Sequence, residues 1–305
     1  MKGVDLSVKI GSLELKNPVM LASGTVGYGN EISEHVDLSE IGAIVTKSVS
    51  LKPRKGNPPN RITETASGML NAIGLANVGV EEFVKNKIPY LKKLDSTLIC
   101  NIAAGSIEEY VECTKILDSE DTVKAFEINV SCPNVKDGGL IFGNDVNNVR
   151  KITAKVRAVT DKPIIIKLSP NTASIKEFAR AAKEEGADAV SAINTLVGTA
   201  FDIYSKKPKI KNVTGGLSGP AIKPVALAKV LEISRNVDIP VIGIGGIMKW
   251  QDAVEFMICG ATAVELGTVN FINPSASLEI IEGLKKYCSD MKISSIKELT
   301  GSYIL

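Results

Sequence analysis

The chain is poor in the residues that mark several common classes of protein. Aromatic side chains make up 5% of its 305 residues, and the formal net charge is only +2. Proteins that bind nucleic acids use basic surfaces and aromatic side chains that stack on bases. The composition therefore argues against a nucleic-acid partner. Its 44% hydrophobic and 23% charged residues are typical of a soluble globular protein.

Long apolar runs and paired cysteine motifs are also missing. No apolar run approaches the roughly 20 residues that a membrane-spanning helix requires, and the charged first residues are not followed by the apolar segment of a signal peptide. The five cysteines are scattered, without the C-x-x-C spacing of a zinc or iron–sulfur site. We therefore expect a cytoplasmic protein with no membrane association and no metal site of its own.

Strand-like and helix-like segments alternate along the chain. Short runs rich in valine and isoleucine are typical of buried parallel strands, and they cover residues 18–24, 43–49, 97–103, 125–131, 163–169, 189–195, 240–246 and 263–268. Segments with apolar residues at helical spacing cover residues 82–94, 106–117, 146–160, 175–185, 224–235 and 250–259. This alternation predicts an α/β fold, a (β/α)8 TIM barrel formed by residues 1–305 as one domain. A doubly wound sheet is the alternative.

Two further features of the barrel follow from the sequence. Residues 1–17 are predicted to form a strand-rich lid over the barrel bottom, and the loops after strands 2, 4 and 6 are longer than a connection requires. The glycine-rich run 215–219 is predicted to be a flexible segment near the end of the third long loop. That loop also holds a lysine cluster, most simply a solvated hairpin, at Lys206, Lys207, Lys209 and Lys211.

Polar residues stand at the carboxyl ends of the predicted strands, where barrels of this kind carry their chemistry. They are Ser23, Lys47, Ser48, Asn101, Asn129, Lys167, Asn194 and Thr195. Lys167 lies within an otherwise apolar run, so it needs a partner, because burying an ammonium group alone is unfavourable. Glycine-rich turns follow strands seven and eight at Gly245-Gly246 and Gly267-Thr268, which favours a phosphate site built from backbone N–H groups.

Cys132 is the candidate reactive group. It follows a strand-like run and precedes Pro133, which cannot continue the strand. A free cysteine is most often a small buried hydrophobe, but this one stands at a strand end between Asn129 and Asn134. The single histidine, His35, is predicted to lie on the surface, which leaves acid–base chemistry to other side chains.

Together these residues resemble the dihydroorotate dehydrogenases, the flavin enzymes of pyrimidine synthesis. The resemblance covers almost the whole chain and rests on residues 22–24, 46–48, 71–75, 129–134, 167–170, 194–195, 215–219 and 245–246. It implies a barrel that holds FMN and oxidises (S)-dihydroorotate to orotate on the route to UMP. Cys132 in place of serine indicates the soluble class, and residues 64–71 and 134–139 resemble its NAD-linked branch.

The resemblance also implies the role of each site residue. Cys132 removes the C5 proton of the substrate, and FMN accepts the C6 hydride. The implied cofactor-binding residues are Ser23, Lys47, Ser48, Asn101, Asn129, Lys167, Ile193, Gly219, Gly245, Gly246, Gly267 and Thr268. The implied substrate-binding residues are Lys47, Asn71, Ala72, Ile73, Gly74, Leu75, Asn129, Asn134, Asn194 and Thr195.

The NAD-linked branch implies a partner, an electron-transfer subunit with FAD and a [2Fe-2S] cluster, and a homodimer of this chain within a heterotetramer. Three alternatives stay open. A fumarate-linked dihydroorotate dehydrogenase would differ in its electron acceptor. A Schiff-base lyase could use Lys167, but it gives no role to Cys132 and the asparagines. A non-catalytic binding barrel would not bring polar groups together at the strand ends.

Overall fold

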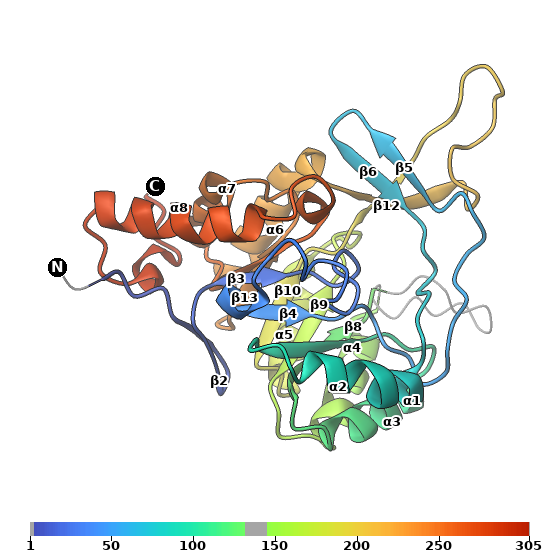
Figure 1. Ribbon diagram of the computed structural model, residues 1–305, viewed down its shortest axis with the longest axis horizontal. Coiled ribbons are helices and arrows are strands. Elements are labelled where there is room, and N and C mark those ends of the chain that lie inside the picture. Colours follow the sequence, from blue (N-terminus) through green and yellow to red (C-terminus); the bar gives the residue numbers. More distant parts are fainter. Residues whose placement is uncertain (1–2, 132–144, 305) are drawn as a thin grey trace.

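The protein is built around a closed barrel of eight parallel strands, seen in Figure 1. The computed structural model describes residues 3–131 and 145–304. The barrel strands are β3 (Val19–Leu21), β4 (Ala43–Val45), β7 (Leu98–Ile102), β8 (Val123–Asn129), β9 (Ile164–Leu168), β10 (Ala189–Ala192), β13 (Val241–Ile244) and β14 (Ala263–Leu266). The ring closes where β14 pairs with β3, which excludes the doubly wound sheet and confirms the predicted barrel.

The strands are buried because helices and strand-connecting segments cover the outside of the ring. The longer helices are α3 (Ile107–Asp118), α4 (Val146–Arg157), α5 (Ile175–Glu184), α6 (Lys223–Ser234), α7 (Trp250–Ile258) and α8 (Ala276–Asp290). Side-chain caps fix several of their starts. Ser106 accepts from the Glu109 N–H at 3.2 Å at the start of α3, and Asp145 accepts from the Asn147 N–H at 2.9 Å at the start of α4.

Shorter helices complete the outer layer. They are α1 (Val80–Glu82), the π-helical η2 (Phe83–Lys87) and α2 (Ile88–Leu91), which together replace the single helix predicted over residues 82–94. The 3-10 helices are η1 (Leu38–Glu40), η4 (Pro220–Ile222), η5 (Thr268–Phe271) and η6 (Ile296–Leu299). Within the described residues, no helix combines the length and the apolar character needed to cross a membrane.

The sequence analysis missed α8 although its pattern is present. Ile280, Leu284 and Cys288 recur every four residues and are fully buried, which is the spacing of one helix face. This face packs against β3, so α8 covers the seam where the barrel closes.

An antiparallel hairpin confirms the predicted lid at the barrel bottom. It consists of β1 (Val8–Ile10) and β2 (Leu13–Leu15). Its turn residue Gly11 packs against Asp188, which directly precedes the amino end of β10. The hairpin therefore lies at the amino ends of the strands, opposite the ends that carry the predicted site.

Two of the predicted long loops contain strands of their own. The loop after β4 contains β5 (Ile62–Thr65) and β6 (Gly68–Asn71), and the loop after β10 contains β11 (Leu196–Thr199) and β12 (Thr214–Ser218). These four form one sheet in the order β11-β12-β6-β5, which stands beside the barrel in Figure 1. The run 215–219, predicted to be flexible, is largely the strand β12.

The lysine cluster lies on the segment between β11 and β12, the gold segment that extends away from the barrel in Figure 1. Its base is a two-stranded bridge between Phe201 and Pro208. All four lysines, Lys206, Lys207, Lys209 and Lys211, are exposed. This agrees with the predicted solvated hairpin.

Candidate functional site

The carboxyl ends of the barrel strands bring the predicted polar residues to one rim. Lys47 follows β4, Asn101 lies in β7, Asn129 ends β8, Lys167 lies in β9, and Asn194 follows β10. Because parallel strands in a closed barrel all end on the same side, these five residues lie toward the same end of the barrel. Converging polar groups of this kind argue against a barrel without a ligand.

Lys167 is buried against two glutamates inside the barrel. Its Nζ lies 3.1 Å from Glu127 Oε1 on β8 and 3.4 Å from Glu265 Oε2 on β14. Lys167 is 6% exposed and both glutamates are 0% exposed. The partner that the sequence required for this lysine is therefore a pair of carboxyl groups.

Neutral donors complete the contacts of one of these carboxyl groups. Ser191 Oγ donates to Glu127 Oε2 at 2.7 Å, and Asn101 Nδ2 donates to Glu127 Oε1 at 2.6 Å. Burial opposes the charged form of Glu127, but Lys167 and these donors outweigh it and lower the pKa of Glu127. Burial likewise disfavours the Lys167 ammonium, yet the carboxyl groups of Glu127 and Glu265 raise the pKa of Lys167.

Glu265 behaves in the opposite way. Burial raises its pKa well above the ordinary value, and the neighbouring charge of Glu127 raises it further. Glu265 Oε1 has no hydrogen-bond donor among the described residues, and neither has Asn101 Oδ1. The barrel interior therefore contains two buried acceptor atoms whose donors are not supplied by the described chain.

Asn129 and Asn194 meet above this charged layer. Asn194 Nδ2 donates to Asn129 Oδ1 at 3.4 Å, and the Ser131 N–H donates to the same oxygen at 3.2 Å. The Tyr110 hydroxyl donates to the backbone carbonyl of Asn129 at 2.7 Å, which anchors the end of β8. Both asparagines are only partly buried.

Lys47 lies at the same rim with its side chain partly buried. Its backbone N–H donates to the carbonyl of Gly27 at 2.8 Å, which holds the chain after β4 against the loop after β3. Burial lowers the pKa of Lys47, and the nearby charge of Arg61 lowers it further, while Glu31 partly opposes this. An anionic ligand at this rim would favour the charged form of Lys47.

The four-stranded sheet brings Asn71 and Thr195 to this rim together. Asn71 pairs with Gly216 in the ladder between β6 and β12, and its Nδ2 donates to the Gly216 carbonyl at 3.2 Å. Thr195 packs on the Cα of Gly216, where any side chain would collide with it. Two predicted substrate residues from distant loops therefore meet at one glycine.

The predicted substrate loop Ala72–Leu75 follows directly from Asn71. Asn57 fixes its path, because the Asn57 Nδ2 donates to the Ala72 carbonyl at 2.9 Å and the Asn57 N–H donates to the Ile73 carbonyl at 2.9 Å. Gly74 has a φ of +71° and packs on Asn57 without room for a side chain. The loop is therefore held in one conformation beside the rim.

The predicted phosphate residues form a second cluster on the same rim. Gly246 has a φ of +76°, and a Cβ there would lie 2.9 Å from the Gly219 carbonyl oxygen. The Thr268 hydroxyl donates to Ser218 Oγ at 2.8 Å. The ends of β12, β13 and β14 thus place flexible backbone and hydroxyl groups side by side, as a phosphate group requires.

The remaining predicted cofactor residues border these two clusters. Ile193 lies under Gly245, where a Cβ would sit 3.5 Å from Ile193 Cγ1. Ser23 follows β3 and is partly exposed, and Ser48 follows β4 and is buried. A Cβ built on Gly267 would meet nothing closer than the Cβ of Ala22 at 4.0 Å, so the rim is open there.

These groups fit a phosphate-bearing flavin. Gly219, Gly245 and Gly246 place backbone without side chains of its own at the ends of β12 and β13, and Lys167 supplies a fixed cation deeper in the barrel. The buried oxygen of Asn101 without a donor could accept a hydrogen bond from such a ligand.

Comparison with known proteins gives the family. The family model described as dihydroorotate dehydrogenase matches residues 5–288. The chain belongs to the dihydroorotate dehydrogenase family. It is 53% identical over 297 residues, 97% of this chain and 98% of the relative, to the dihydroorotate dehydrogenase B (NAD(+)) catalytic subunit of Trichlorobacter lovleyi. It is 52% identical over 302 residues to the subunit of the same name from Geobacter sulfurreducens, covering 99% of both chains.

A more distant relative carries the same name. The dihydroorotate dehydrogenase B (NAD(+)) catalytic subunit of Bacteroides thetaiotaomicron is 49% identical over 298 residues, 98% of each chain. The family membership predicted from the rim motifs is therefore confirmed over nearly the whole length.

Two predicted site residues of this family member lie outside the described residues. Cys132 and Asn134 belong to the segment 132–144, and Ser131 is the last residue described before it. The Ser131 hydroxyl donates to the backbone carbonyl of Lys167 at 3.3 Å, so the chain enters that segment beside β9. The roles of Cys132 and Asn134 stay predictions.

The sequence analysis missed Glu127, Glu265 and Ser191. Each is a polar residue in the middle of an apolar strand run, and that was the available signal. The sequence required a partner for Lys167 without saying which kind of group it would be. It did not identify which strand would supply one.

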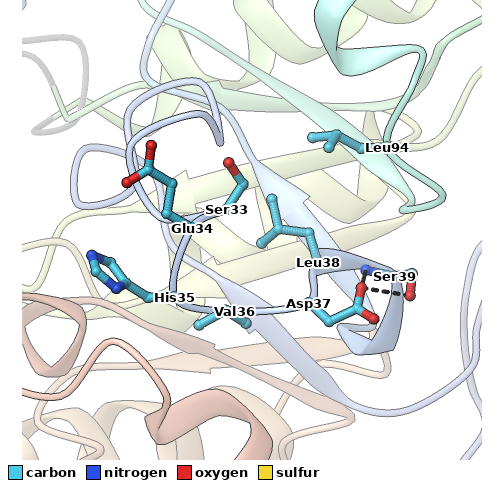
Figure 2. A pocket seen from close by; sticks show the side chains of 8 residues that line it. All are labelled: Ser33, Glu34, His35, Val36, Asp37, Leu38, Ser39 and Leu94. Atoms are coloured by element: carbon cyan, nitrogen blue, oxygen red, sulfur yellow. Dashed lines mark hydrogen bonds between the residues drawn. The ribbon is translucent and has the colours of Figure 1, made fainter.

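The surface pocket in Figure 2 is separate from this site. It is lined by residues 33–39, on the connection from β3 to β4, and by Leu94. Asp37 is engaged locally, accepting from the Ser39 N–H at 2.9 Å and the Ser39 hydroxyl at 2.7 Å. His35 is exposed there, as predicted, and the pocket shares no residue with the rim.

Proposed function

We propose that this chain oxidises (S)-dihydroorotate to orotate in pyrimidine synthesis, as the catalytic subunit of an NAD-linked enzyme. The observation that carries the proposal is the rim itself, where Lys47, Asn71, Asn129, Lys167 and Asn194 converge in a chain of this family. Relatives that are about half identical over their full length are named as the NAD(+)-linked catalytic subunit, which supports the choice of acceptor.

The cofactor in this proposal is FMN. Gly219, Gly245, Gly246 and Thr268 would hold its phosphate, since their backbone and hydroxyl groups lie together at the ends of the last strands. Lys167 would stand near the flavin ring, where a fixed cation stabilises added negative charge. When bound, FMN supplies the acceptor for the hydride from C6 of the substrate.

The asparagines would hold the substrate ring. Dihydroorotate presents both donors and acceptors along its amide edges, and an asparagine side chain offers one of each kind. Asn71, Asn129 and Asn194 lie at the described rim, and Asn134 is the fourth in this proposal. Lys47 would pair with the negative charge of the carboxylate.

Cys132 would act as the base that removes the C5 proton. The thiolate is the reactive form of cysteine, and the residue follows directly after Ser131, which is placed beside Asn129 and the β9 backbone. In this proposal the thiolate would take the proton from one face of the ring, and the flavin would accept the hydride from the other.

Electrons would leave through a partner. The sequence contains no glycine-rich dinucleotide motif opening a βα unit and no cysteine spacing for an iron–sulfur cluster. An electron-transfer subunit with FAD and a [2Fe-2S] cluster would therefore carry electrons to NAD, and two copies of this chain would form the core of a cytoplasmic heterotetramer. The word "subunit" in the relatives' names supports a separate partner.

The decisive experiment measures flavin reduction by dihydroorotate in the absence of oxygen. We expect Cys132→Ala to retain its flavin but to be reduced at least about a hundredfold more slowly, the lower range of a general-base contribution. Cys132→Ser should recover part of the rate at high pH, because a hydroxyl is a much weaker base. Cys259→Ala, at the end of α7 and away from the rim, is the matched control. A wild-type rate in Cys132→Ala would assign the base to another residue.

A further inference from the structure

The charged layer inside the barrel contains one more acid than base. Glu127 and Glu265 are both fully buried, and the same ammonium group of Lys167 contacts both of them, at 3.1 and 3.4 Å. The shared ammonium group holds the two carboxyl groups close to each other. Two ionised carboxylates here would leave an uncompensated negative charge in a low-dielectric interior, which is strongly unfavourable.

Within the described residues, the strands that surround the two glutamates contribute no second cation. The strands β13 and β3 flank β14, and their described residues Val241–Ile244 and Val19–Leu21 carry no titratable side chain. On the other side, β7 and β10 contribute the neutral side chains of Asn101 and Ser191. Among the described residues, the net charge of this layer therefore depends only on Glu127, Glu265 and Lys167.

The two carboxyl groups are not equivalent. Glu127 accepts hydrogen bonds from Lys167, Ser191 and Asn101, which is the environment of an ionised carboxylate. Glu265 accepts only from Lys167, and its Oε1 has no donor among the described residues. An added proton is therefore better placed on Glu265, from which it can be donated to Glu127.

We propose that Glu127 and Glu265 share a single proton, so that together they present one negative charge to Lys167 and keep the charged layer neutral. Glu265 is thus a positioning residue for the Lys167 ammonium. It supports the lysine geometrically without adding a second negative charge beneath the reaction site. The raised pKa of Glu265, caused by burial and by the charge of Glu127, agrees with this assignment.

Because the proton is shared, either glutamate can carry the single negative charge when the other is replaced. When Glu127 is replaced by glutamine, the like charge beside Glu265 disappears, and Lys167 draws Glu265 into its ionised form. When Glu265 is replaced, Glu127 stays ionised. Either single replacement therefore keeps one negative charge, and only the double replacement removes it.

Isotope-edited infrared spectroscopy tests the proton directly. The purified protein is labelled with glutamate carrying 13C in its side-chain carboxyl group, so that flavin and aspartate bands do not shift. At about pH 8, where ordinary glutamates are ionised, the wild type should show a carboxylic-acid band that moves on labelling. The band should be lost in Glu265→Gln and in Glu127→Gln, and kept in Glu14→Gln, a control on the exposed side of β2.

The second measurement is the reduction potential of the flavin. Only this measurement depends on the proposed FMN site. We expect each single glutamine variant to change the equilibrium for two-electron reduction by less than about threefold and the double variant to change it by more than about tenfold, a shift of about 30 mV. A chain without flavin would defeat the proposed function but leave the infrared result valid. Absence of the acid band in the wild type, its persistence in Glu265→Gln, or a single variant that shifts the potential as far as the double variant would overturn the shared proton.

Discussion

Replacement of Lys167 by methionine would remove the one positive charge that contacts Glu127 and Glu265 among the described residues. Methionine keeps an unbranched side chain of similar length, so the change is mainly one of charge. Removing one partner of a buried ion pair costs about 3–5 kcal/mol, because the remaining charge has no compensation. At neutral pH we therefore expect Lys167→Met to lower the free energy of unfolding by about this amount.

The loss of unfolding free energy in Lys167→Met should depend on pH. The direction of this dependence follows from the pKa of Glu127. In the wild type the contacts of Glu127 lower its pKa below the ordinary value of 4.5 despite burial. Without Lys167 we expect burial to prevail, so that the folded pKa of Glu127 rises above 4.5. A carboxyl group of this kind contributes stability below its unfolded pKa and loses it as the pH rises toward its folded pKa, at about 1.4 kcal/mol per pH unit. The raised pKa of Glu265 affects both proteins and largely cancels in the comparison.

Urea unfolding at about pH 5 and about pH 7 measures this dependence. The difference in unfolding free energy between wild type and Lys167→Met should grow by up to about 2.7 kcal/mol between these two conditions. Lys9→Met, on an exposed position of β1 at the barrel bottom, is the control and should be neutral at both. An equal cost at both pH values would show that methionine acts by altered packing, and would refute the electrostatic account.

Two further predictions concern the cofactor and the partner. Gly246→Ala should lose most of its flavin, because a Cβ at Gly246 would lie 2.8 Å from Lys223 Cβ and the φ of +76° disfavours alanine. The ratio of flavin to protein absorbance measures this loss, and full retention of flavin by the variant would contradict the phosphate site. The flavin released from the wild type should be FMN. The chain alone should pass electrons from dihydroorotate to a dye and should reduce NAD only when the partner subunit is added, whereas rapid NAD reduction by the chain alone would contradict the need for a partner.

The sequence predicted the barrel and its rim because both depend on local patterns. Each barrel strand is a short apolar run bounded by a turn, and the polar residue at its end is placed by the strand itself. Asn129, Lys167 and Asn194 could therefore be assigned to one site before any contact was known. The catalytic role of Cys132 stays a prediction, since the residue lies outside the described residues.

The contacts across the barrel could not be predicted in the same way. Lys167 meets Glu127, 40 residues away, and Glu265, 98 residues away. Which inward-facing residues meet depends on the tilt and stagger of the strands in the closed ring, which no single strand specifies. The sequence could show that the lysine needs a partner, but not which strand provides it.

Tertiary pairing also overrode local propensity in the run 215–219. Glycine is unfavourable in strands, so the run predicts a flexible loop. In the structure β12 lies between β11 and β6. Gly215 and Gly216 are needed there because a Cβ on either would collide with Asn71 or Thr195. Close approach of another chain segment, and not flexibility, explains these glycines.

The pairing of β6 with β12 has a consequence for how the enzyme is made. Asn71 and Gly216, which meet in this ladder, are separated by 145 residues. At a synthesis rate of about 5–20 residues per second, β6 leaves the ribosome roughly 7–30 seconds before its partner strand exists. During that time β6 can pair only with β5, and the predicted substrate loop that follows β6 lacks the contact of Asn71 with Gly216. The ligand-binding rim is therefore completed late, after β10 and most of the barrel have been synthesised, and a truncated chain that ends before β12 would lack this contact.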